Sequence, residues 1–433
     1  MKQSRIGGWF QLDAHGSALR KEIIAGVIGF MTTVYIIAVN SFILSEAGIP
    51  LEGAVLATIL TCFISCLLMG FWANTPIILV PGMGINAMFT YTLVQSMGLS
   101  WQEALAVVFI SGALFVVTAF TRLSQLLSDA IPATLKEAIT VGLGLFLMLI
   151  GLEKGGIVER GDNSIIALGQ LNEPIVMATV ISFFVAMILF LRNVPGNFLW
   201  SILFGTLLAW WLDLLPKQAS SSKFRFSDYQ EVFANMSFAS WMELPFWVAV
   251  FSITMVIVFE NIGLVHGHVT ILRQPEKFKK AYQANAISAM LSGVFGTSPT
   301  VSSVESAAAM ASGGRTGLTA VTTGILFLSS IFFIPYMKYI PDNAIAPILM
   351  IIGGLMIQNV RNLELKDLTE AFPAIFIIAM IPFTSSIADG IAIGFILYPI
   401  LKVASGKGKD VSFPLYVIAG LFFINFVLHS VQL

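Results

Sequence analysis

The stretch GTSPTVSSVESAA, residues 296 to 308, decides how this chain folds. It places Glu305 between two long apolar runs, where a carboxylate at a helix centre costs roughly 2.5 to 3.5 kcal/mol if it behaves like Asp. Pro299 and the β-branched residues after it disfavour an ordinary helix. The stretch therefore predicts a broken span, in which an extended TVSSV segment precedes a helix that begins near Glu305.

The composition around this stretch is that of a polytopic membrane protein. Of the 433 residues, 57% are hydrophobic and 11% are charged, which is about half the charged content of a typical globular chain. Apolar segments recur from residue 22 onward, many with the roughly 17 to 25 residues that cross a bilayer as a helix. The first 22 residues are mixed polar, so we expect no cleavable signal peptide.

The apolar segments predict an all-α fold with fourteen spans. With a cytoplasmic N-terminus, 17 Lys and Arg residues fall inside and 6 outside, as expected for a multi-pass protein of the cell inner (plasma) membrane. Whether residues 412–430 form a further crossing is left open. The predicted spans are 22–44, 53–73, 76–95, 101–121, 138–152, 174–191, 197–212, 245–267, 283–295, 298–313, 317–336, 344–360, 371–385 and 387–401.

Seven spans precede the 213–244 loop and seven follow it, which indicates a 7+7 inverted repeat. MGFWANTPIILVPG aligns with SGVFGTSPTVSSVE at an offset of 223 and pairs Gly70 with Gly293 and Pro76 with Pro299. Spans 3 and 10 are therefore both predicted to be broken, with the helix of span 3 beginning near Met83. The backbone N–H and C=O groups that such breaks leave unpaired must line a cavity inside the protein rather than face lipid. In that cavity the N-termini of two facing helices would suit a polar or anionic ligand.

Few acidic residues fall within the predicted spans. Glu22 and Glu103 begin their spans and are expected to reach water, and Asp389 is interpreted as solvated or structural. Glu260 and Glu305 are the candidates for a substrate or ion pathway, although a protonated structural role is the alternative for each. If the site opens to each side of the membrane in turn, the pKa of such a buried carboxylate can change and a proton can be taken up or released. The two carboxylates therefore provide a basis for proton coupling.

Other motifs predict neither a metal site nor a cofactor. Cys62 and Cys66 lie four residues apart in one apolar span and are interpreted as small hydrophobic residues. His266 and His268 are interpreted as hydrated interface residues, with a relay role as the alternative. No phosphate-binding loop is visible, and an intramembrane enzyme using the two glutamates as acid and base is disfavoured by the lack of any accompanying catalytic motif.

Four segments together resemble the azaguanine-like purine permease branch of the nucleobase-cation symporter 2 family. They are EIIAGVIGFMTTVYIIAVNSFILSEAGIP (22–50), PGMGINA (81–87), GTSPTVSSVESAA with the following GGRTGLTAV (296–308 and 313–321), and FPAIFIIAMIPFTSSIADGIAIGF (372–395). The resemblance implies proton-driven uptake of purine nucleobases, by movement of a core domain against a gate domain. It implies no cofactor and no nucleic-acid partner; a homodimer is left open.

The resemblance also implies a division of the chain. The expected boundaries are a cytoplasmic segment 1–21, core spans 1–4 at 22–121, gate spans 5–7 at 122–213, an extracellular loop 214–244, core spans 8–11 at 245–336, gate spans 12–14 at 337–404 and a C-terminal segment 405–433.

The family's substrate carboxylates match Glu260 and Glu305, and its third-span asparagine matches Asn86. One carboxylate can accept two adjacent N–H groups of a purine such as guanine, a role we give to Glu260. The remaining expected contacts are the backbone at Met83 and Val304, an apolar wall from Phe259, and Tyr35 and Thr32 of the first span.

This chain has FENIGL (259–264) where the branch usually has FDTLGT, so the choice among adenine, guanine, hypoxanthine and xanthine stays open. An anion, or another small planar heterocycle, carried on the same fold is the alternative substrate.

Overall fold

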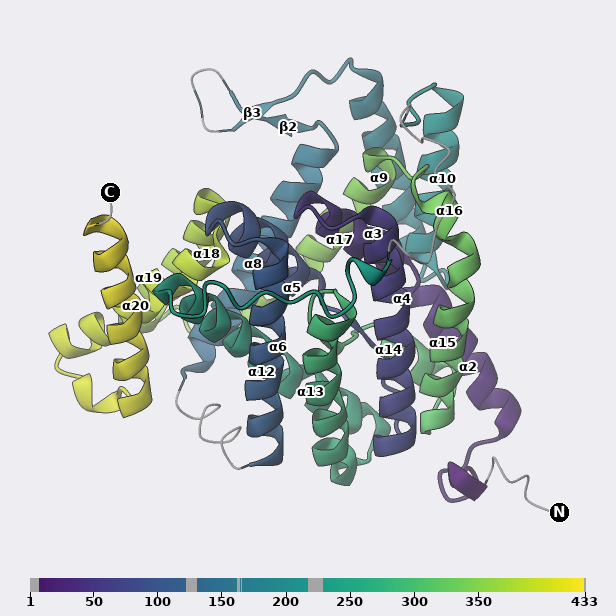
Figure 1. The fold of residues 1–433 in the computed structure, drawn as a ribbon, viewed down its shortest axis with the longest axis horizontal. Coiled ribbons are helices and arrows are strands. Elements are labelled where there is room, and N and C mark those ends of the chain that lie inside the picture. The colour runs from purple at the N-terminus through teal and green to yellow at the C-terminus, as the bar shows by residue number, and fades with distance from the viewer. Residues whose placement is uncertain (1–7, 122–130, 162–163, 165, 217–228, 432–433) are drawn as a thin grey trace.

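The described part of the chain is almost entirely helical (Figure 1). The computed structural model describes residues 8–121, 131–161, 164, 166–216 and 229–431. Within these ranges nine helices are long and apolar enough to cross a membrane, and three shorter apolar helices accompany them. The prediction of an all-α polytopic membrane protein is confirmed, whereas the count of fourteen spans stays a prediction.

The first half of the chain runs from α2 to α10. Its elements are α2 (Leu19–Thr33), α3 (Tyr35–Glu46), α4 (Leu51–Leu68), η1 (Met69–Ala73), β1 (Leu79–Pro81), α5 (Met83–Ala87), η2 (Met88–Ser96), α6 (Trp101–Phe120), α8 (Ala133–Lys154), α9 (Pro174–Leu191) and α10 (Asn197–Trp211). A short antiparallel hairpin, β2 (Val158–Glu159) with β3 (Ala167–Leu168), separates α8 from α9.

The second half repeats this order. It contains α12 (Leu244–Leu272), η3 (Pro275–Lys277), α13 (Phe278–Phe295), β4 (Thr300–Ser302), α14 (Ser306–Ala311), α15 (Gly317–Ser329), η4 (Ser330–Phe333), α16 (Ile334–Met337), α17 (Asp342–Ile357), η5 (Gln358–Asn362), α18 (Leu368–Thr384) and α19 (Ile387–Ala404). It is followed by η6 (Gly408–Asp410) and α20 (Phe413–Val431), the latter packed against α19 and α12.

Two contacts reproduce the repeat offset of 223 that the sequence predicts. β1 and β4 pair antiparallel, and the pair Leu79 with Ser302 joins residues 223 apart. The Ser288 hydroxyl donates a hydrogen bond to the Ser65 hydroxyl, again across 223 positions. A two-fold axis that exchanges the two halves of the chain brings residues on the axis into contact with their own repeat equivalents. The two contacts are therefore those expected if such an axis passes through the strand pair.

The aligned glycines Gly70 and Gly293 have matching roles. A Cβ on Gly70 would lie 2.7 Å from the Gly317 carbonyl oxygen, and one on Gly293 would lie 2.9 Å from the Leu105 carbonyl oxygen. Each glycine therefore allows a helix backbone to approach its neighbour closely, as small residues do between membrane helices.

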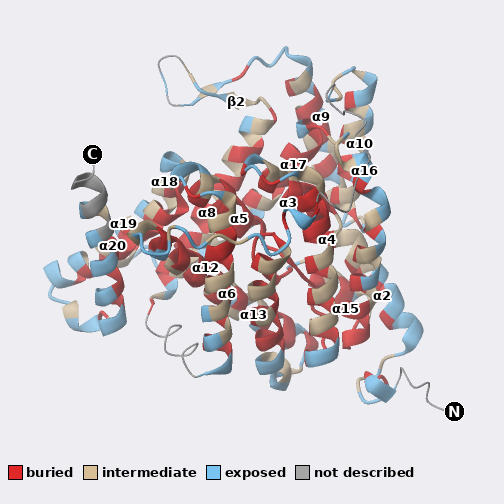
Figure 2. Ribbon diagram, in the orientation of Figure 1, coloured by how far each residue is buried: buried red, intermediate tan, exposed pale blue. Residues whose placement is uncertain are grey.

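Several helices extend beyond the predicted spans. α12 ends at Leu272 rather than 267, α13 begins at Phe278 rather than 283, and α8 begins at Ala133 rather than 138. The added residues include charged side chains such as Lys136 and Lys279. Their low hydropathy ends the predicted span, although the helix itself continues. Figure 2 shows buried residues concentrated in the middle of the bundle, around α5, α8, α12 and α17, with exposed residues at its outer edges.

Candidate functional site

The two broken spans meet in the interior of the bundle. Besides the strand pairing, Gly82 N–H donates to the Pro299 carbonyl at 3.1 Å and Ser303 N–H donates to the Ile78 carbonyl at 2.9 Å. The helix of the first broken span begins at Met83, as predicted, and that of the second begins at Ser306 with Glu305 as its N-cap residue. The hydrogen bonds satisfy backbone groups that the two breaks would otherwise leave unpaired.

Polar side chains from neighbouring helices hold these strands. The Asn261 side-chain oxygen accepts hydrogen bonds from Ser302 N–H at 3.0 Å and from the Asn285 amide. On the opposite side, the Asn40 side-chain oxygen accepts from the Ser298 hydroxyl at 3.0 Å. The sequence analysis did not single out Asn40 and Asn261, although an asparagine inside an apolar helix is itself a signal for a buried polar contact.

Glu305 is held by two hydroxyl groups rather than by its own helix. The Tyr35 hydroxyl donates to Glu305 Oε1 at 2.7 Å and the Ser303 hydroxyl donates to Oε2, whereas no side-chain bond caps α14. Tyr35 is buried, and its ring meets the Phe198 ring of α10 edge-on at 4.9 Å. Beside this group Val304 is 64% exposed, so the carboxylate is fixed in direction yet lies at an accessible surface.

Glu260 lines a small pocket between helices of the two predicted domains. The pocket has a volume of about 20 Å³, which is room for about one water molecule. Among the described residues, none forms a hydrogen bond or ion pair with the Glu260 carboxylate. The lining comes from α8, α12 and α17 and consists of Lys136, Ile139, Thr140, Leu143, Met255, Val256, Phe259, Glu260 and Met356.

Lys136 is the second charged residue of this pocket and was not among the predicted site residues. Its Nζ lies 5.1 Å from the centroid of the Phe259 ring, within the range of a cation–π contact. Lys136 lies on the first turn of α8, outside the predicted span 138–152, so the sequence places it beyond membrane depth.

The remaining predicted residues are not among those that line the Glu260 pocket. Asn86 is buried, and its amide donates to the Asn40 carbonyl at 3.3 Å, while its side-chain oxygen has no partner within the described part of the chain. Met83 is buried. The Thr32 hydroxyl donates to carbonyls of its own helix, at Ile28 and Gly29.

Glu22 corrects a prediction. It was expected to reach water, but it is fully buried and its carboxylate accepts from Arg315 N–H at 3.0 Å, Thr316 N–H at 3.2 Å and the Thr319 hydroxyl at 2.5 Å. The loop after α14 folds back onto the start of α2 and covers it. Glu22 therefore anchors the loop that follows the helix carrying Glu305.

His268 is the second correction. It was interpreted as hydrated, but it is buried, and its Nδ1 lies 2.8 Å from the hydroxyl of Ser302 on β4. His266 is exposed, as expected. Cys62 and Cys66 are buried free thiols, which agrees with their interpretation as small hydrophobic residues.

One ion-pair group links elements of the two predicted domains. Lys154 at the end of α8 pairs with Glu46 at the end of α3, and its Nζ lies 3.7 Å from Asp342 Oδ1 at the start of α17. The Tyr91 hydroxyl donates to the second oxygen of Glu46 at 2.8 Å. The group therefore joins the predicted core, through Glu46, to two helices of the predicted gate.

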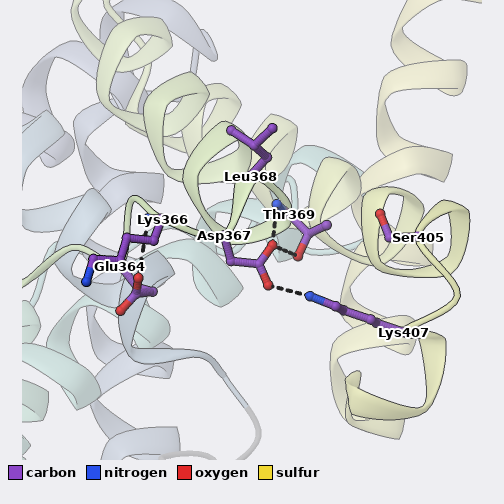
Figure 3. Close-up of a pocket in the computed structure, with 7 residues that line it drawn as sticks. All are labelled: Glu364, Lys366, Asp367, Leu368, Thr369, Ser405 and Lys407. Carbon is purple, nitrogen blue, oxygen red and sulfur yellow. Dashed lines mark hydrogen bonds and ion pairs between the residues drawn. The ribbon is translucent and has the colours of Figure 1, made fainter.

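A larger hollow of about 610 Å³ lies at the surface, between the start of α18 and the end of α19 (Figure 3). Lys407 Nζ donates to Asp367 Oδ2 at 2.8 Å, and Thr369 N–H donates to Asp367 Oδ1 at 2.9 Å. The Lys407 hydrogen bond, and then those from Thr369, lower the pKa of Asp367. Nearby, the buried Lys402 pairs with Glu370 at 2.7 Å. These charges pair with one another and join the two helices, so we assign the hollow a structural role.

Comparison with known proteins decides the family. The profile of a family described as a permease family matches residues 20–393. The nucleobase transporter PlAzg2 of Paenibacillus larvae is 48% identical over 381 residues, which cover 88% of this chain and 76% of that protein. The chain belongs to the purine permease branch of the nucleobase-cation symporter 2 superfamily. It is a membrane transporter and not an enzyme.

Two further similarities place this purine permease among known folds. The guanine/hypoxanthine permease PbuO of Bacillus subtilis is 36% identical over 427 residues, covering 96% of this chain and 99% of that protein. The transmembrane domain of a cyanobacterium bicarbonate transporter, BicA, superimposes with a TM-score of 0.63 at 14% identity, over 87% of this chain and 97% of that one. At 14% sequence identity, this similarity establishes only that the two proteins share a fold.

Proposed function

We propose that this permease imports purine nucleobases together with protons across the plasma membrane, with its N-terminus in the cytoplasm. The proposal is supported by membership of the purine permease branch and by relatives named for nucleobase and guanine/hypoxanthine transport. The fold it shares with a bicarbonate transporter does not choose between a purine and an anion. The carboxylate of Glu260 favours a purine, because it accepts hydrogen bonds from N–H groups such as those on a purine edge.

The position of Glu260 carries the proposal. An ionised carboxylate has two acceptor oxygens and no donor, so it pairs with two adjacent N–H groups on the edge of a purine such as guanine. Hydrogen bonds to a charged group contribute about 1.5 to 3 kcal/mol each. Phe259, next to Glu260 in the same pocket, supplies an aromatic face for the purine ring.

Entry of a purine requires the pocket to open. Its present volume of about 20 Å³ holds one water molecule rather than a bicyclic base. Its walls are α12, from the proposed core at 22–121 and 245–336, and α8 and α17, from the proposed gate at 122–213 and 337–404. Separation of α12 from the two gate helices would enlarge the site, which is the movement that alternating access requires.

Glu305 and its neighbours complete the proposed site. Tyr35 directs the Glu305 carboxylate through its 2.7 Å hydrogen bond. The exposed residue Val304 offers the base its backbone N–H, since its carbonyl already accepts from Ala307 N–H. Asn86 contributes a buried amide oxygen, and Met83 the first backbone groups of α5. Thr32 is the weakest candidate, because its hydroxyl already donates to its own helix.

Glu260 and Glu305 are also the proposed proton carriers. Ionisable residues within membrane spans commonly form the proton relays of pumps and transporters. If movement of the core exposes these carboxylates to one side of the membrane at a time, each can exchange its proton with that side alone, so purine and proton cross together.

The substitution Glu260→Gln tests the proposal. It replaces one acceptor oxygen by an amide donor and removes the titratable group, so accumulation of labelled guanine and hypoxanthine should fall to background. Glu243→Gln is the matched control, because Glu243 is the exposed N-cap residue of the same helix and should transport normally. Accumulation by Glu260→Gln at the control rate would overturn the role of Glu260.

A further inference from the structure

Lys154 lies between two carboxylates that belong to different predicted domains. Its ammonium pairs with Glu46, at the end of α3 in the predicted core. Its Nζ also lies 3.7 Å from Asp342 Oδ1, at the start of α17 in the predicted gate. Lys154 itself belongs to α8 of the gate. One ion pair therefore crosses the boundary between core and gate, whereas the other lies within the gate.

The order of spans places this group at the outer side of the membrane. With the proposed cytoplasmic N-terminus, the first and fifth predicted spans end outside and the twelfth and fourteenth begin there. Glu46 follows the first span, Lys154 follows the fifth and Asp342 precedes the twelfth. At the same side, the hydroxyl of Thr92 in η2 of the core accepts from Ile387 N–H at the start of α19 at 3.0 Å. Core and gate are therefore in contact at the outer ends of these helices.

Close backbone contacts hold the two gate helices α8 and α17 together. A Cβ on Gly144 of α8 would lie 2.7 Å from the Gly353 carbonyl oxygen of α17, and a Cβ on Gly151 would lie 2.9 Å from the Ala346 carbonyl oxygen. Small residues allow this approach between membrane helices, and packed helices move as rigid units in domain movements. The ion pair within the gate is therefore kept when core and gate separate, whereas the pair to the core is lost.

We propose that Lys154 is a switch residue that closes the outer side of the transporter. It pairs with Glu46 when core and gate are in contact, and it is retained by Asp342 when they separate to admit a purine from outside. Glu46 also keeps a partner after separation, because the Tyr91 hydroxyl of the core donates to its Oε2 at 2.8 Å. Each of the three charges then has a partner in both states, which avoids the cost of an unpaired charge.

The inference rests on the proposed function and adds to it the contact that controls opening to the outside. Glu46→Gln removes the pair that exists only in the closed state, so the population open to the outside should rise. Asp342→Asn removes the partner of the ammonium in the open state, while the closed state keeps its pair to Glu46, so that population should fall. A merely structural contact predicts no such opposition, because loss of either carboxylate would loosen it.

Labelling of a cysteine at position 92 measures the open population. Thr92 is fully buried beside α19, so Thr92→Cys should react with a membrane-impermeant maleimide added outside whole cells only when core and gate separate. The wild type gives the background, since Cys62 and Cys66 are buried. The rate should rise about two- to fivefold with Glu46→Gln and fall by a similar factor with Asp342→Asn, as expected for one partly exposed ion pair.

Glu153→Gln is the matched control, because Glu153 is exposed and adjacent to Lys154 on α8. It loses the same charge without loss of either ion pair and should leave the rate unchanged. Rates that change in the same direction for both carboxylate variants, or in neither, would overturn the inference. Asp342→Asn decides the matter even if Glu46→Gln fails to fold: a rate equal to or above that of the parent protein would overturn it.

Uptake of labelled guanine by the wild type in proteoliposomes separates this inference from the proposed function. Absence of uptake, together with the expected labelling rates, would overturn the proposed function and leave the switch standing. Uptake with labelling rates that ignore both carboxylates would do the reverse.

Discussion

Replacement of Glu22 by alanine should destabilise the protein strongly without touching the purine pocket. The carboxylate is fully buried and accepts from two backbone N–H groups, at 3.0 and 3.2 Å, and from the Thr319 hydroxyl at 2.5 Å. Alanine would leave the two backbone N–H groups unpaired, while the Thr319 hydroxyl keeps its 3.3 Å hydrogen bond to the Glu22 backbone carbonyl; each unpaired group costs about 1 to 3 kcal/mol. Taking about 1.5 kcal/mol for each of the two N–H groups, the free energy of unfolding should fall by about 3 kcal/mol.

Thermal unfolding of the purified protein in detergent measures this change. At about 2 °C per kcal/mol, the lower end of the range for larger domains, the midpoint should fall by about 6 °C. Glu243→Ala is the control, since Glu243 is exposed and should shift the midpoint by no more than about 1 °C. Equal midpoints for Glu22→Ala and the control would contradict this expectation, because they would mean that water already satisfies the two backbone N–H groups.

Two further substitutions test other contacts. Tyr35→Phe removes the 2.7 Å hydrogen bond to Glu305, which is worth about 1.5 to 3 kcal/mol. The KM for guanine should therefore rise at least about tenfold. An unchanged KM would show that Tyr35 does not direct the carboxylate. Lys154→Met removes the partly exposed ion pairs to Glu46 and Asp342, each worth up to about 1 kcal/mol. Amide hydrogen exchange should then accelerate by up to about fivefold at the end of α3, which loses one pair, and by up to about thirtyfold at the end of α8, which loses both. Exchange at the wild-type rate would argue against a link between core and gate.

Much of the fold could be predicted from local sequence. Pro299 and the β-branched run after it cannot form a regular helix, and the strand β4 lies there. The offset of 223 came from a few matching residues such as Gly70 and Gly293, and it recurs in the contact between Ser65 and Ser288. These features are predictable because they depend on backbone preference and on repetition along the chain.

The features that could not be predicted depend on contacts between distant segments. Glu22 lies at the start of an apolar run, so its carboxylate is expected to reach water. It is buried because the segment 315–319 packs over it and donates hydrogen bonds to it. His268 is buried because β4 crosses beside α12. Lys136 enters the pocket because α8 begins before the apolar run does. Hydropathy along the chain carries no information about these pairings.

We propose that this permease carries purine nucleobases together with protons. The most direct test is uptake of labelled guanine by proteoliposomes that contain the purified protein, with the interior more alkaline than the medium. Guanine should accumulate above its outside concentration in the wild type. A protonophore should abolish this accumulation, and Glu260→Gln should not support it. Accumulation of labelled bicarbonate or sulfate in place of guanine, or guanine uptake that ignores the proton gradient, would contradict it.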